Sequence, residues 1–107
     1  MEIHIKTIGL PGAKKLRSIA TARIGAALGR VGHAVQSVTI RLSGIHKPLG
    51  VADKLCRVVI QMKGRFVVFE ELGPDAGRVI ERAAARVQSA IASQAGAHEA
   101  GRTALPA

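Results

Sequence analysis

Hydrophobic and polar residues alternate along four short stretches of the chain, which is the pattern of half-buried β-strands. The first stretch places Ile3 and Ile5 on one face, and Glu2, His4 and Lys6 on the other. Three later stretches repeat this period of two. The sequence therefore predicts strands over 2–8, 37–42, 55–63 and 66–71.

Two longer stretches repeat their apolar residues every three or four positions, as one face of a helix requires. The first covers about 13–31, and Gly32 is expected to end it. Two glycines inside it, Gly25 and Gly29, each cost roughly 1 kcal/mol relative to alanine, so this helix depends on packing. The second helix follows Asp75, which is well placed to cap it. Its apolar face consists of Val79, Ile80, Ala83, Ala84, Val87 and Ile91.

The order of these elements predicts an α+β domain of the form β-α-β-β-β-α. We expect a four-stranded sheet with both helices packed on one face, its first strand parallel to a neighbour and the other three an antiparallel meander. Glycine and proline predict a long loop over 43–53. The domain is expected to span 1–94. Because 95–107 is rich in Ala and Gly without periodicity, we expect a disordered tail there.

Three arginines, Arg78, Arg82 and Arg86, recur every four residues on the polar side of the second helix. A row of guanidinium groups at this spacing suits a phosphate backbone, although such a row is also typical of a solvated helix face. The first helix adds Lys14 and Lys15 on its exposed first turn. Two further arginines, Arg23 and Arg30, flank its apolar stripe.

The overall charge favours the nucleic-acid interpretation. The chain has 107 residues, with 16 Lys and Arg against 7 Asp and Glu, and a formal net charge of +9. Such an excess favours a polyanionic partner. A membrane surface is the weaker candidate, because the apolar helix faces lack bulky aromatic anchors and no apolar run approaches the roughly 20 residues of a membrane span. The N-terminus lacks the architecture of a secretion signal, and we expect a cytoplasmic protein.

Catalysis finds little support in the sequence. The single cysteine, Cys56, alternates with Val58, Ile60 and Met62 and is expected to be buried, which does not suit a nucleophile. The four histidines are scattered without metal-ligand spacing. Neither glycine-rich stretch is followed by the lysine and hydroxyl of a phosphate-binding loop. We therefore expect no enzyme, no metal, no cofactor and no small-molecule substrate.

The order of elements and several phrases resemble the ribosome hibernation promoting factor family, also called ribosome-associated inhibitors or subunit interface proteins. The phrases are Ser37-Val38-Thr39-Ile40-Arg41-Leu42-Ser43, Asp53-Lys54-Leu55-Cys56-Arg57, and the helix positions Asp75, Ile80, Ala84 and Arg86. The resemblance covers roughly residues 1–93. The chain departs from the family at Gly77, where an aromatic residue is usual, and it carries fewer acidic residues on both helices.

This resemblance implies a fold similar to the double-stranded RNA-binding domain and a place on the small ribosomal subunit, bound through ribosomal RNA. Members of the family are thought to block the channel for messenger and transfer RNA during stress or stationary phase. By position, the family's RNA-facing groups correspond to Arg23, Arg30 and Arg86, and geometry adds Arg78 and Arg82. Because the chain ends at Ala107 without a dimerisation domain, the resemblance is to the short forms.

Two other functions stay open. One is a general basic RNA-binding domain that acts away from the ribosome. The other is a protein-interaction module that uses its open sheet face, although that face is expected to be polar and basic, with His4, Lys6, Thr39, Arg41, Arg57 and Gln61. Only Phe66 and Phe69 are aromatic, so the sheet lacks the stacking platform of single-stranded RNA readers. Recognition of RNA shape and backbone is the expected mode.

Overall fold

The computed structural model describes residues 1–46 and 52–96, without the side chains of Arg30, His46, Ala52 and 93–96. In chain order the elements are β1 (Glu2–Ile8), α1 (Ala13–Ala27), the 3-10 helix η1 (Gly29–Ala34), β2 (Val35–His46), β3 (Ala52–Met62), β4 (Arg65–Gly73) and α2 (Ala76–Gly96). The predicted order of strands and helices is thus confirmed. The expected tail loses 95 and 96 to α2, and the rest of it, 97–107, lies outside the described residues.

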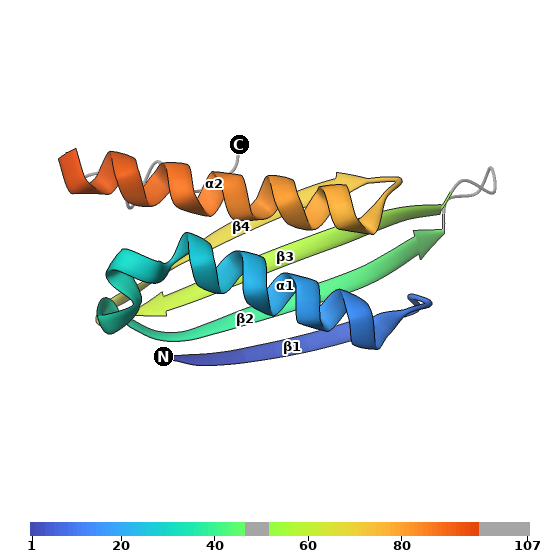
Figure 1. The fold of residues 1–107 in the computed structure, drawn as a ribbon, viewed down its shortest axis with the longest axis horizontal. Coiled ribbons are helices and arrows are strands. Elements are labelled where there is room, and N and C mark those ends of the chain that lie inside the picture. The colour runs from blue at the N-terminus through green and yellow to red at the C-terminus, as the bar shows by residue number, and fades with distance from the viewer. Residues whose placement is uncertain (47–51, 97–107) are drawn as a thin grey trace.

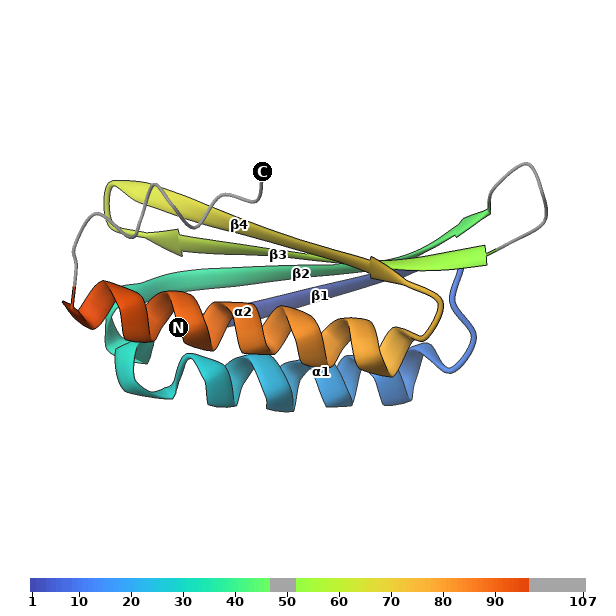
Figure 2. The ribbon, with the colours of Figure 1, turned by 90° about the horizontal axis from the view of Figure 1, so that it is seen from above.

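The four strands form one sheet in the order β1-β2-β3-β4. Strand β1 is parallel to β2, as the helical crossover between them requires, and the other two pairings are antiparallel. Both helices cover one face of this sheet, and the other face is left open (Figures 1 and 2). This is the α+β architecture that the sequence predicts.

The core lies between the sheet and the helix layer. Because side chains alternate along a strand, every second residue in the middle of β2, β3 and β4 points toward the helices and is buried there, as Ile40, Val58 and Phe69 illustrate. Helix α1 contributes Ala20 and Ile24 from its apolar stripe. Helix α2 completes the core with Val79, Ile80, Ala83, Ala84 and Val87.

Strand β1 has its predicted bounds, whereas β2, β3 and β4 are longer than the alternation predicts, and the expected loop over 43–53 is wrong at both ends. The pairing of β2 with β3 continues from Ser43↔Leu55 to His46↔Ala52. Gly44, which suggests a loop in the sequence, serves here as a point of close approach: a Cβ atom at this position would lie 2.6 Å from the carbonyl oxygen of Gly9. Glycine therefore fits the strand because the loop before α1 passes directly beside it.

The first helix is shorter than predicted. Helix α1 ends at Ala27, and the chain continues as η1 through Gly32, the expected end. At this junction the N–H of Leu28 donates to the carbonyls of both Ile24 and Gly25, and the N–H of Val31 donates to the carbonyl of Leu28. The tighter 3-10 turn thus replaces the last turn of the predicted helix at Gly29, a residue with low helix propensity.

Candidate nucleic-acid interface

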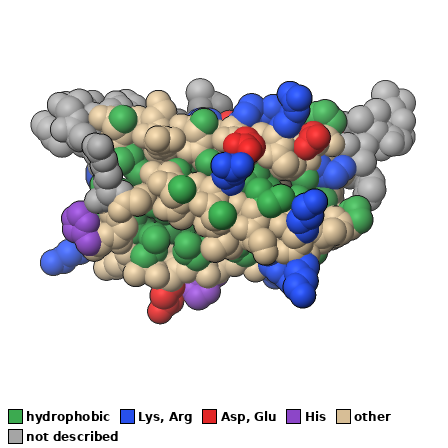
Figure 3. Space-filling model, viewed as in Figure 1, with side chains coloured by type: hydrophobic (Ala, Val, Ile, Leu, Met, Phe, Trp, Pro, Cys, Tyr) green, Lys and Arg blue, Asp and Glu red, His purple; other side chains and the backbone are tan. Residues whose placement is uncertain are grey.

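The basic residues of the two helices belong to the layer that covers one face of the sheet. Helices α1 and α2 run in the same direction, so both begin at the same end of the domain (Figure 1). Figure 3 shows most of the visible Lys and Arg side chains over the half of this layer in which the helices begin. Because helix N-termini carry partial positive charge, this half suits an anionic ligand.

The beginning of α1 is basic and has no acidic side chain near it. Lys14, Lys15 and Arg17 are exposed, and among the described residues none of them has an ion-pair partner. The N-cap residue, Gly12, offers no side-chain hydrogen bond, and the first turn contains no acid. The backbone N–H groups of the first turn of α1 and these three cations therefore remain available to a phosphate.

The beginning of α2 combines a cap with a free cation. The backbone N–H of Arg78 donates to Oδ1 of Asp75 at 3.1 Å, which confirms the predicted cap. The side chain of Arg78 is exposed, and within the described part of the chain it has no ion-pair partner. Arg78 is thus the member of the arginine row that faces solvent most freely.

A shallow hollow of about 560 Å³ separates the two helices, and Arg23 and Arg78 lie on its walls. Across it, Nη2 of Arg23 lies 3.4 Å from Oε2 of Glu81, with more than half of each side chain exposed. An exposed pair of this kind contributes at most about 1 kcal/mol. Arg23 is therefore paired, but weakly enough for a phosphate to displace Glu81.

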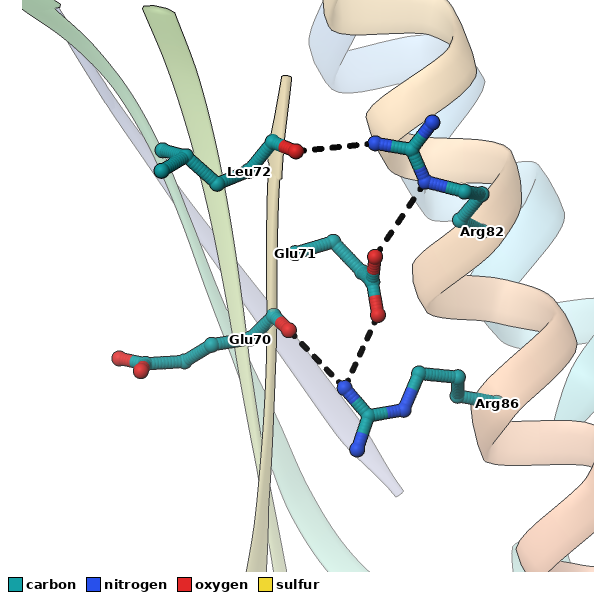
Figure 4. A network of polar contacts seen from close by, with 5 residues as sticks. All are labelled: Glu70, Glu71, Leu72, Arg82 and Arg86. Carbon is teal, nitrogen blue, oxygen red and sulfur yellow. Dashed lines mark hydrogen bonds and ion pairs between the residues drawn. The ribbon is translucent and has the colours of Figure 1, made fainter. Parts of the chain in front are cut away.

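Arg82 and Arg86 take part in a cluster that joins α2 to the edge strand β4 (Figure 4). Both arginines donate hydrogen bonds to the carboxylate of Glu71, Arg82 from Nε at 3.3 Å and Arg86 from Nη1 at 2.9 Å. Each arginine also donates to a strand carbonyl, Arg82 to Leu72 at 2.9 Å and Arg86 to Glu70 at 3.0 Å. The guanidinium of Arg86 lies over the ring of Phe69, 5.8 Å from its centroid.

These contacts correct the prediction of one uniform polar row. Residues four apart on a helix differ by about 40° around its axis, so the row turns from solvent at Arg78 toward β4 at Arg86. The side chains of Arg82 and Arg86 are still 50% and 38% exposed, whereas that of Glu71 is 17% exposed. Two of the three arginines therefore stabilise the fold while keeping part of each guanidinium in solvent.

Two residues of this surface escape the sequence prediction. Arg17 follows Lys14 by three positions and extends the basic first turn, a helical spacing that was available in the sequence. Glu71 sits beside Glu70 at the expected end of a strand, yet it points to the helices. The alternation of Val67, Phe69 and Glu71 carries that signal, because all three occupy the same strand face.

Arg30 lies on η1, at the end of the layer opposite the helix N-termini, and its side chain is outside the described residues. The other predicted site residues fall into two groups. One group is free in solvent, with Lys14, Lys15 and Arg78. The other is held in ion pairs, with Arg23, Arg82 and Arg86.

Cys56 is completely buried, as the sequence predicts. Burial disfavours its thiolate, and the nearby Glu71 carboxylate repels it, so the pKa of the thiol rises from 9.0 to about 12. A thiol in this state is a poor nucleophile at neutral pH. Among the described residues, no three His, Cys, Asp or Glu side chains gather in a way that could hold a metal ion.

Alkylation of Cys56 should therefore require unfolding. We expect iodoacetamide to label the folded protein far more slowly than the protein in urea, as followed by mass spectrometry. The thiolate forms more readily in the unfolded chain, so the free energy of unfolding should fall as the pH rises from about 9 toward 12. Rapid labelling of the native protein at pH 8 would contradict this assignment.

No helix in the described part of the chain is long and apolar enough to cross a bilayer.

Comparison with known proteins identifies the fold. Neither a family model nor a curated protein matches the sequence. Among solved structures, a ribosomal subunit interface protein from Coxiella burnetii is similar over 90% of this chain and 99% of its own, with a TM-score of 0.69 and 12% identity. The N-terminal domain of Thermus thermophilus Protein Y is similar over 83% of this chain and 93% of its own, with a TM-score of 0.64 and 18% identity. The chain therefore has the fold of these two proteins, in agreement with the resemblance found in the sequence.

Proposed function

We propose that this domain binds the small ribosomal subunit through ribosomal RNA and represses translation in dormant or stressed cells. The observation that supports the proposal most is the gathering of unpaired basic side chains where both helices begin, on a fold shared with a ribosomal subunit interface protein. A protein bound to ribosomes would act in the cytoplasm.

The mechanism needs no chemical step. Lys14, Lys15 and Arg78 would contact phosphates directly, and the uncapped N-terminus of α1 would add backbone donors. Arg82 and Arg86 would extend this contact along α2 with the exposed parts of their guanidinium groups. A rigid domain held in the channel in this way would exclude messenger and transfer RNA by its volume.

We assign the ribosome-binding unit to the folded domain. The sequence predicts this domain over 1–94, and its last helix extends it to Gly96. The residues after this helix would form a tail outside the binding unit. Recognition would rest on RNA shape and backbone, because Phe69 is buried and Phe66 alone is an exposed aromatic residue.

The proposal predicts co-sedimentation of the purified protein with small subunits through sucrose, at low and at moderate salt. A Lys14→Gln/Arg78→Gln variant removes two cations that lack ion-pair partners among the described residues and leaves the Glu71 cluster intact. We expect it to bind about tenfold more weakly, with a dependence of log K on log salt that is shallower by about two.

The matched control is Lys63→Gln/Arg65→Gln, which removes the same charge from the turn after β3 and from the first residue of β4, at the opposite end of the domain. It should bind nearly as well as the natural sequence. Wild-type protein that stays at the top of the gradient in both salts would overturn the ribosomal proposal. If that protein still bound an RNA duplex, the function would be that of a general RNA-binding domain.

A further inference from the structure

A row of cations crosses the face of the sheet that the helices leave open. In the strand register Lys6 lies beside Arg41, Arg41 lies opposite Arg57, and Arg57 lies opposite Glu70. All four side chains are exposed. Because neighbouring strands are about 4.8 Å apart, the three cations lie within about 10 Å.

The charge of this row is only partly balanced. Glu70 accepts a hydrogen bond from Nη1 of Arg57 at 3.2 Å. Lys6 and Arg41 have no ion-pair partner within residues 1–46 and 52–96. Like charges placed directly opposite each other on neighbouring strands destabilise a sheet. A bound anion would relieve this repulsion.

We propose that Lys6, Arg41 and Arg57 form a second binding site for RNA phosphates, on the face opposite the helix layer. The ribosomal source of that RNA rests on the function proposed above. The hydroxyl groups of β2 on the same face, Ser37, Thr39 and Ser43, are further donors of the kind that contact phosphate oxygens.

The surroundings of the row favour phosphates over bases. Phe66 is the one phenylalanine that points to this face, and it pairs with Gln61, in the register row that also contains Ser37. The cation row lies four residues away from it on each strand, beyond the row of His4, Thr39, Val59 and Val68. The imidazole of His4 is the one ring in the row next to the cations, so no platform of several aromatic side chains lies beside them, and contact with phosphates is favoured over base stacking.

A second site changes how the domain would sit in RNA. The backbone measures 21 Å along its shortest axis, which runs from the helix layer to the sheet. Phosphate contacts on both faces would let one domain bridge two RNA walls, one on each side of it. A protein held from two sides fills a cleft more completely than one bound to a single wall.

The test compares the natural sequence with a Lys6→Gln/Arg41→Gln variant, using a short RNA duplex and separately the small ribosomal subunit. The substitutions remove like-charge repulsion, so the variant should fold with an unchanged or higher melting temperature. We expect its binding to both ligands to weaken about tenfold at low salt, and the salt slope to fall by about two. The Lys63→Gln/Arg65→Gln protein again controls for net charge.

Each of the other possible outcomes would contradict either the sheet site or the ribosomal function. Unchanged duplex binding by the variant, or no duplex binding by the wild type, would overturn the sheet site. A loss confined to the ribosomal subunit would also overturn it and would indicate an acidic protein surface as the partner of the row. If the wild-type protein does not bind the subunit but binds duplex RNA through Lys6 and Arg41, the ribosomal function is overturned and the sheet site is supported.

Discussion

Changing Glu71 to glutamine should weaken the fold and strengthen RNA binding at the same time. The carboxylate holds Arg82 and Arg86 at 3.3 and 2.9 Å, so the cluster of two cations and one anion has a net charge of +1. Glutamine keeps the shape of the side chain but removes its charge, which raises the cluster to +2. We expect the free energy of unfolding to fall by about 1–2 kcal/mol, since these are charge-assisted bonds at a half-exposed site.

In the same Glu71→Gln variant, affinity for the small subunit at low salt should rise about threefold to tenfold, with a steeper salt dependence. Urea unfolding and sedimentation measure the two effects on one preparation. Glu2→Gln is the matched control, because it changes net charge equally but at an exposed carboxylate whose one hydrogen-bond and ion-pair partner among the described residues is His4. A folded Glu71→Gln protein that binds no better than this control would mean that Arg82 and Arg86 do not contact phosphate.

Replacing Ile24 by alanine should be among the most damaging single changes in the core. Ile24 is fully buried on α1, within the cluster that joins both helices to the sheet. The lost apolar contacts and the cavity left behind cost about 2–5 kcal/mol, a large part of the 5–15 kcal/mol that stabilises a typical domain. The melting temperature should fall by roughly 10 °C or more.

The matched control for this change is Ile8→Ala, the same substitution at an isoleucine that is 42% exposed at the end of β1. It should cost less than about 1 kcal/mol, since fewer buried contacts are lost. Equal destabilisation of the two variants, measured by urea unfolding, would contradict the placement of Ile24 in the core.

Hydrophobic periodicity predicts the four strands and both α-helices, though not η1, because one face of each of these elements is buried and the other is exposed to solvent. It fails where pairing or backbone packing decides instead. The extension of β2 past Ser43 depends on hydrogen bonds to β3, and Gly44 signals a loop in the sequence although its lack of a side chain makes room for Gly9. The end of α1 at Ala27 depends on a local change to 3-10 geometry, which no apolar pattern encodes.

The sequence predicts where the basic residues of the candidate interface lie on the helices, but not the contacts that they make. Arg78, Arg82 and Arg86 look equivalent in the sequence because they share one spacing. They differ in the structure because β4 packs beside the later turns of α2 and brings Glu71 against two of them. The partner of a charged side chain depends on tertiary contacts, which helical spacing alone does not determine.

The order of strands in the sheet repeats their order in the chain, and this has a consequence for how the domain assembles. The hairpin of β3 and β4 closes through the short connection between Met62 and Arg65, whereas β1 reaches β2 only across the whole of α1 and η1. Closing a longer loop costs more chain entropy, so we expect the sheet to grow from β3 and β4 and to add β1 last. Growth would then begin at β4, where the arginines of α2 donate to the carbonyls of Glu70 and Leu72, and it would proceed toward the side on which β1 docks.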